Sequence, residues 1–64
     1  MENYVILVKG RVVKTCTIKE DAKTFAQKKS VEYPKLTFEV VAEDIMTGSI
    51  HTVALYENGE DFWN

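Results

Sequence analysis

Two side chains in this sequence, Cys16 and His51, could supply a nucleophile and a base. A thiol activated by an imidazole is a common arrangement in covalent catalysis, and the chain has one residue of each type. The two residues belong to different predicted hairpins, and nothing in the sequence places a third group to orient the imidazole. The sequence therefore favours a buried structural thiol at Cys16 and a histidine near the end of a sheet.

Acidic pairs and metal-binding motifs give no stronger signal. Glu39 and Glu43 share one face of a predicted strand, but their spacing of four residues corresponds to about 13 Å, which is too far for paired-carboxylate catalysis. The sequence has no C-x-x-C, H-x-x-H, glycine-rich phosphate loop or G-x-S-x-G motif. We therefore predict a protein that is not an enzyme and that uses no metal or cofactor.

Length and composition predict a single compact domain over residues 1–64. Of the 64 residues, 45% are hydrophobic and 28% are charged, which is ordinary globular usage. The longest apolar run, residues 5–8, is far shorter than the roughly 20 residues that span a bilayer. The amino end lacks the pattern of a secretory signal, and a single cysteine offers no internal disulfide. We expect a cytoplasmic protein with no membrane partner.

Charge is divided unevenly along the chain. Every lysine and arginine lies in the first 35 residues, which carry a net charge of +4, whereas the remaining residues carry −6. The basic residues are Lys9, Arg11, Lys14, Lys19, Lys23, Lys28, Lys29 and Lys35. A pI of about 5.2 disfavours nucleic acid as the main partner, because phosphate-binding domains are usually basic throughout. Nucleic-acid binding through the basic first half remains the alternative, and two solvated faces would also explain the split.

Hydrophobic periodicity predicts the elements that would position these side chains. Residues 3–9 and 11–17 are rich in β-branched types and flank Lys9-Gly10, so they form a hairpin with the second strand at an edge. Thr17 and Glu20 fit a capping box that starts an amphipathic helix over about 18–32. Residues 35–43 alternate as a half-buried strand, which the turn at 44–48 pairs with the segment that follows.

The D-x-x-T-G sequence at 44–48 resembles a hairpin turn in which aspartate binds turn amides and glycine is left-handed. This turn predicts three facing pairs, which are Ala42–His51, Val40–Val53 and Phe38–Leu55. The helix would then cover the face that carries Phe38, Val40, Val53 and Leu55. Asn58-Gly59 predicts a second reversal that folds Phe62 back against Leu55, with a short fifth strand as an option.

The expected fold is an α+β domain of ββαββ type, with a four-stranded sheet and one helix on one face. The favoured strand order is 2-1-4-3, and 2-1-3-4 is the alternative. In its element order, its hairpin positions and its size, the chain resembles compact β-grasp domains such as the immunoglobulin-binding domains of bacterial surface proteins. This resemblance implies a fold and carries no activity with it.

A single helix leaves one sheet face uncovered, and the first hairpin is apolar on both faces. We therefore predict a protein-binding module, an inhibitor, adaptor or modulator, whose partner is another protein or a second copy of the chain. In its size and its lack of catalytic residues the chain resembles the small accessory proteins of phages and other viruses. Ordinary exposed surface is the competing interpretation. The expected contact residues are Ile6, Val8, Glu39, Val41, Glu43, Tyr56 and Trp63.

Overall fold

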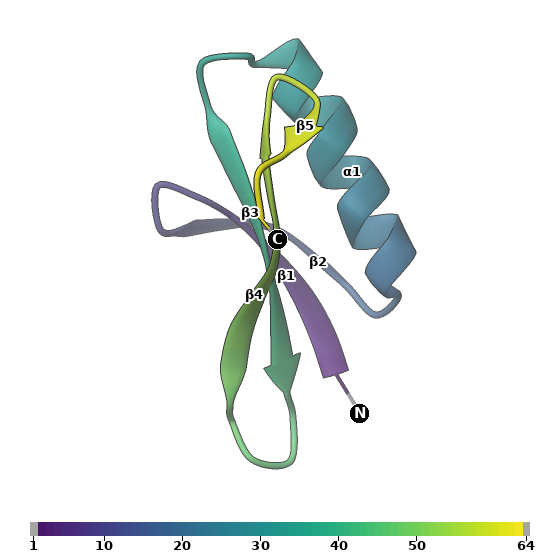
Figure 1. The fold of residues 1–64 in the computed structure, drawn as a ribbon. Coiled ribbons are helices and arrows are strands. Elements are labelled where there is room, and N and C mark those ends of the chain that lie inside the picture. The colour runs from purple at the N-terminus through teal and green to yellow at the C-terminus, as the bar shows by residue number, and fades with distance from the viewer. Residues whose placement is uncertain (1, 64) are drawn as a thin grey trace.

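The computed structural model describes residues 2–63, which form one helix packed on one five-stranded antiparallel sheet (Figure 1). The elements in chain order are β1 (Glu2–Val8), β2 (Arg11–Cys16), α1 (Lys19–Glu32), β3 (Thr37–Asp44), β4 (Ile50–Glu57) and β5 (Glu60–Asp61). The predicted α+β class is confirmed, and the predicted ββαββ order is confirmed as far as β4. The expected count of four strands is wrong, because the short strand β5 adds a fifth.

The strands lie in the order β2-β1-β3-β4-β5, and each neighbouring pair is antiparallel. The favoured order 2-1-4-3 is therefore wrong, and the alternative 2-1-3-4 is observed with β5 added. The helix connects β2 to β3, and these two strands run in the same direction with β1 between them. The resemblance to β-grasp domains is limited to size, hairpin positions and the order of elements along the chain.

The turn after β4 explains this strand order. Asn58 and Gly59 have φ angles of 50° and 82°, as a two-residue hairpin turn of type I′ requires. The turn lays β5 along one edge of β4, and the backbone N–H of Phe62 donates to the Leu55 carbonyl over 2.7 Å, as predicted. Since a strand has only two edges, β4 cannot pair with β5 and also lie between β1 and β3. The place beside β1 therefore goes to β3.

The turn between β3 and β4 forms as the sequence predicts. Asp44 Oδ1 accepts hydrogen bonds from the backbone N–H groups of Met46 (2.9 Å) and Thr47 (3.4 Å). Gly48 has a left-handed φ of 76°. This turn sets the register of the hairpin at its own end, where Ala42 faces His51 as predicted.

Farther from the turn, a β-bulge between Val40 and Val41 shifts the register of β3 and β4 by one residue. Val40 consequently faces Ala54, and Phe38 faces Tyr56. The predicted pairs Val40–Val53 and Phe38–Leu55 are therefore wrong. The bulge moves the residues after Val53 to the opposite side of the sheet from the one that strict alternation predicts.

The hydrophobic core lies between α1 and the sheet face that the helix covers. Ala22 and Ala26 are fully buried, and their small side chains let the helix approach the fully buried Ile6 and Val40 of the two central strands. The buried members of the core are Ile6, Ala22, Ala26, Phe38, Val40, Ala54 and Tyr56. Half-buried side chains that pack against them are Tyr4, Val8, Cys16, Phe25, Leu36 and Val53.

The helix begins one residue later than the capping box predicts. Ile18 is the N-cap residue, and within residues 2–63 no side chain caps the first turn. Thr17 and Glu20 therefore do not form the expected capping box. The carboxyl end of the helix is as predicted, because α1 ends at Glu32 before the residue that precedes Pro34.

The helix is held to the β4–β5 turn by hydrogen bonds to both backbone groups of Gly59. The buried Ser30 hydroxyl donates to the Gln27 carbonyl (2.7 Å) and accepts from the Gly59 N–H (2.8 Å). The Gln27 side-chain amide donates to the Gly59 carbonyl over 3.0 Å. A Cβ atom on Gly59 would lie 2.9 Å from Cγ2 of Val31. We call this arrangement the Gly59 clamp.

Replacement of Ser30 by alanine tests the clamp. The change leaves the N–H of Gly59 without its acceptor, and we expect the free energy of unfolding to fall by about 1–3 kcal/mol. Thr24→Ala is the matched control, since it removes an exposed hydroxyl from the same helix. Urea unfolding followed by circular dichroism measures both variants. Equal stability of the two would contradict the clamp.

Alanine at Gly59 tests the close approach of Val31. Gly48→Ala is the control, because Gly48 also has a positive φ but a Cβ atom placed on it would have no neighbour within 4 Å. Left-handed strain costs each variant roughly 1–2 kcal/mol. We expect Gly59→Ala to lose a further ~1–3 kcal/mol through overpacking. The added change Val31→Ala should recover that extra loss, and failure to recover it would exclude the steric explanation.

Candidate interaction surface

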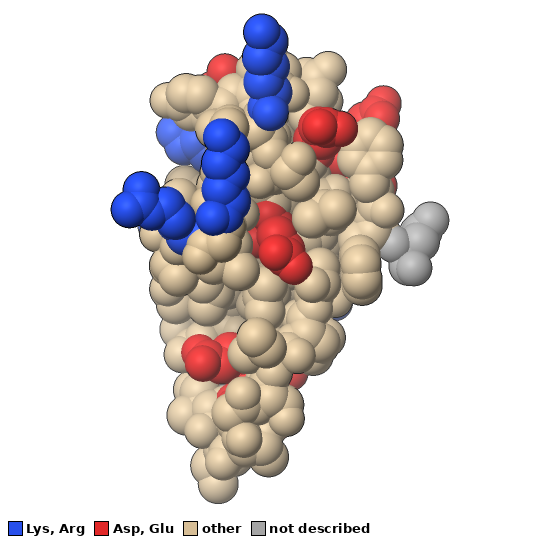
Figure 2. All heavy atoms as spheres, turned by 90° about the vertical axis from the view of Figure 1, so that its left-hand side faces the viewer, with Lys and Arg blue, Asp and Glu red and all other residues tan. Residues whose placement is uncertain are grey.

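One face of the sheet has no helix over it among the described residues, and we call it the open face. Because paired residues of antiparallel strands point to the same side, the strand register shows which side chains lie there. The apolar residues of the open face are Val5, Leu7, Val12, Val41, Ile50 and Leu55. Figure 2 views the molecule from the side away from the helix.

A shallow apolar hollow of about 260 Å³ lies on the open face. Its lining residues are Val5, Leu7, Val12, Val41, Glu43 and Ile50. Val41 is only 6% exposed, whereas Val12 and Ile50 are 62% and 66% exposed. Water at these apolar groups is released when another surface covers them, so the hollow favours contact with a partner.

Two carboxylates of β3 share the open face with this hollow. Thr52 Oγ1 donates to Glu39 Oε2 over 2.6 Å and so holds that carboxylate beside Val41, which faces Thr52 in the sheet. Glu43 lines the hollow itself and faces Ile50. In Figure 2, lysine and arginine gather at the top and upper left of this view, whereas acidic groups lie at the upper right, in the middle and at the lower left. The apolar hollow therefore has acidic neighbours.

The structure separates the seven expected contact residues into three groups. Glu39, Val41 and Glu43 lie on the open face, as predicted. Ile6, Val8 and Tyr56 lie on the face beneath the helix, so their placement on the uncovered face is wrong. Ile6 is 0% exposed and Tyr56 is 5% exposed. Trp63 follows β5 and is about half exposed. Its backbone N–H donates to Asp61 Oδ1 over 2.9 Å.

One of the two β-bulges in the sheet explains the placement of Tyr56. The bulge in the β3–β4 pair turns Tyr56 toward the helix. A second register shift, between Ile6 and Leu7 of β1, occurs in the β1–β2 pair, so Ile6 faces Lys14 instead of Val13. Val12 lies on the turn side of this shift and faces Leu7 on the open face, as the two-residue turn at Lys9-Gly10 requires. The first bulge explains why Tyr56 was expected among the contact residues, and neither bulge has a glycine to signal it. Val12 was not among the expected contact residues, although the register next to the Lys9-Gly10 turn was an available signal.

The tip of the β3–β4 hairpin is a further apolar feature that sequence reasoning did not assign to the site. Ile45 and Met46 are both exposed, and Met46 is the more exposed of the two. The sequence did contain a signal for this feature, because the two x positions of the D-x-x-T-G turn are apolar. Side chains at the tip of a hairpin turn have no neighbours that could cover them. The hairpin tip extends beyond the end of the helix in Figure 1.

Cys16 and His51 do not come together. Both lie in one row across the sheet, in which Cys16 faces Tyr4, Tyr4 faces Ala42 and Ala42 faces His51. Three strand spacings therefore separate them, or about 14 Å, which excludes a thiol and imidazole pair. Within residues 2–63, no three His, Cys, Asp or Glu side chains are grouped so that they could hold a metal ion.

Comparisons with known proteins give no relative from which a function could be transferred. No protein-family model, no curated protein and no solved structure matches the chain. Over the described range, no helix is long and apolar enough to cross a membrane. Function is therefore inferred from the surfaces of the molecule.

The buried phenol of Tyr56 makes the free energy of unfolding decrease at alkaline pH. Burial raises the pKa of Tyr56 above its ordinary value of 10.0, and the carboxylates of Asp61 and Glu20 raise it further. The contribution of the neutral Tyr56 phenol to the free energy of unfolding is therefore fully present below about pH 10. It is lost as the pH rises through the raised pKa of the folded state.

Tyr56→Phe tests this dependence, because it removes the phenol and keeps the ring. We expect the variant to lose less stability than the natural protein between about pH 9 and pH 12. Urea unfolding at a series of pH values measures both proteins. The same alkaline decline in both would show that Tyr56 is not the titrating group.

Proposed function

We propose that the protein is a small binding module without catalytic activity, which occupies a surface on a partner protein through its open face. It acts as an inhibitor, adaptor or modulator of that partner. This mode of action is shared with the small accessory proteins of phages and other viruses that the chain resembles in size and economy. The observation that carries the proposal is the solvent-exposed apolar hollow between β1, β2, β3 and β4.

The chemistry of the open face describes the partner. Val12 and Ile50 are the most exposed apolar side chains in the lining of the hollow, so a partner that covers it would bury them. Glu39 and Glu43 favour a partner with basic groups around an apolar patch, because opposite charges at a rim speed association. The molecule extends 34 and 22 Å along its two longest axes, so one sheet face is comparable in size to one side of a standard interface, which buries about 800 Å².

Affinity capture with open-face variants tests the proposal. Tagged natural protein, Ile50→Lys and Val12→Lys are used as baits in nuclease-treated lysate of the cells that produce the protein. Ile18→Lys is the matched control, because Ile18 is 57% exposed at the start of the helix and lies off the open face. We expect the natural protein and the control to recover the same partner, and the two open-face variants to recover at least about tenfold less.

Three results would contradict the proposal. Equal recovery by Ile50→Lys and Ile18→Lys would show that the open face does not bind the partner. In a parallel capture from lysate without nuclease, recovery of RNA or DNA that falls steeply with added salt would favour the alternative, a nucleic-acid accessory factor that uses the basic first half. Sedimentation that shows a dimer, which Ile50→Lys dissociates, would identify the occupant of the open face as a second copy of the chain.

A further inference from the structure

The helix covers the sheet unevenly and leaves a groove on the β2 side of the molecule. Five strands are about 20–25 Å wide, whereas a helix with its side chains is about 10 Å in diameter. The Gly59 clamp holds α1 near β4 and β5, and the helix packs more closely on β3 and β4 than on β2. Two adjoining hollows lie between α1 and β2, with Phe25 in the lining of both. We call them together the edge groove.

One hollow of the edge groove is apolar. It has a volume of about 250 Å³, which accommodates one large side chain. Its lining residues are Val8, Val13, Phe25, Lys29, Tyr33, Leu36 and Phe38. Lys29 is the one charged member, and its ammonium group lies over the Phe25 ring, 5.9 Å from the centroid. A bulky apolar group would therefore find mainly apolar neighbours here.

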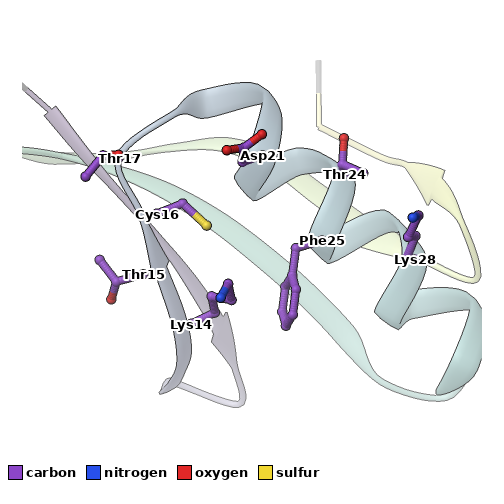
Figure 3. A pocket seen from close by; sticks show the side chains of 8 residues that line it. All are labelled: Lys14, Thr15, Cys16, Thr17, Asp21, Thr24, Phe25 and Lys28. Atoms are coloured by element: carbon purple, nitrogen blue, oxygen red, sulfur yellow. The ribbon is translucent and has the colours of Figure 1, made fainter.

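The other hollow is larger, with a volume of about 610 Å³, and its charge is mainly positive. Lys14 of β2 and Lys28 of α1 line it, and Asp21 is the one acidic residue in its lining. Figure 3 shows the Phe25 ring and the Cys16 thiol directed into the space between the strand and the helix. Lys14 Nζ lies 5.5 Å from the centroid of the Phe25 ring, so ammonium groups from both walls converge on it.

The basic side chains of the groove are poorly neutralised. Among the described residues, the one ion pair joins Lys29 to Glu32 over 3.5 Å. Lys14 and Lys28 therefore have no carboxylate within 4 Å in that part of the chain. Arg11, which faces Val8, adds a further positive charge on the same side of the sheet. An acidic ligand would supply the missing counter-charges.

Strand β2 adds a free backbone edge to the edge groove. Of the residues that the structure describes, those of β1 alone pair with β2, so one edge of β2 has free backbone donors and acceptors. All of β2 except Cys16 is exposed. A strand added to this edge would run along the groove, and alternate side chains would face the helix side.

We propose that the edge groove binds an extended acidic peptide, which adds a strand to the free edge of β2. One bulky apolar side chain of the peptide enters the hollow beside Val13. A carboxylate two residues away reaches the hollow of Lys14 and Lys28, because side chains on one face of a strand repeat about every 7 Å. This site lies on the other side of the sheet from the open face and does not depend on the function proposed for that face.

The observations favour a peptide over a nucleic acid. Stacking of bases needs an exposed aromatic face. The ring of Phe25 is half-buried, and the ammonium groups of Lys14 and Lys29 already lie over it. The free edge of β2 matches the hydrogen-bonding pattern of a polypeptide, which a sugar-phosphate backbone lacks.

Titration with a synthetic peptide tests the site. The probe is fluorescein-labelled Ser-Thr-Asp-Val-Phe-Val-Glu-Thr-Ser, which carries an acid two residues to either side of its phenylalanine and so fits both strand directions. One control peptide has lysine in place of both acids, and another has serine in place of phenylalanine. Fluorescence anisotropy measures binding, and we expect each control to bind at least about tenfold more weakly than the probe.

Protein variants assign the binding to the groove. We expect Lys14→Glu and Lys28→Glu each to weaken binding about tenfold, and Val13→Asp to do the same through the apolar hollow. Lys19→Glu is the control, since it makes the same charge change on an exposed residue of α1 outside the groove lining. Circular dichroism checks that every variant is folded. Hydrogen exchange of the bound protein should show new protection of amides in β2.

Several outcomes would overturn the inference. Absence of binding up to about 1 mM probe would show that the groove is no peptide site. Equal binding of the lysine control peptide would exclude the role of Lys14 and Lys28. Protection confined to β3 and β4 would place the peptide on another surface. Displacement of the probe by a short oligothymidylate, with the same loss in Lys14→Glu, would assign the groove to nucleic acid instead.

Discussion

The position of the helix depends on the hydrogen bonds that hold Gly59 against α1. Because Ser30 and Gln27 satisfy both backbone groups of this glycine, the β4–β5 turn and the carboxyl half of the helix form one unit. Glycine is required there, since its φ is positive and Val31 occupies the space of a Cβ. The clamp at one edge of the sheet leaves the opposite edge, β2, without cover. The edge groove is thus a consequence of the same contact that stabilises the helix.

The sheet adapts to its single helix through two bulges that lie in one row. Ile6 and Val40 face each other at the centre of the sheet and are both fully buried. The register shifts of the outer pairs occur beside these two residues, between β1 and β2 and between β3 and β4. Bulges increase the local twist of a sheet, so both outer strands can curve around the helix while the central pair keeps regular alternation.

Local signals in the sequence predict the elements and turns, and tertiary competition decides the rest. The turns at Gly48 and Gly59 were predictable because each needs a left-handed residue at a fixed place. The strand order was not deduced, although Asn58-Gly59 contained the decisive signal, since β5 takes an edge that the order 2-1-4-3 gives to another strand. The bulge beside Val40 has no local signature. The bulge places Tyr56 in the core, and because no sequence signal reveals it, Tyr56 was expected on the contact surface instead.

The order of charges in the sequence becomes an order in space because the two halves of the chain build different parts of the fold. The basic half forms β1, β2 and α1, whose lysines line both walls of the edge groove. The acidic half forms β3, β4 and β5, and Glu39 and Glu43 of β3 lie on the opposite side of the sheet. A sheet with one helix necessarily has one uncovered face and one uncovered edge. In this chain the uncovered face carries Glu39 and Glu43, whereas the uncovered edge carries the lysines of the edge groove, so the two surfaces differ in the sign of their charge. Under the two proposals made above, each surface would attract a ligand that the other repels, and charge alone would keep the two contacts distinct.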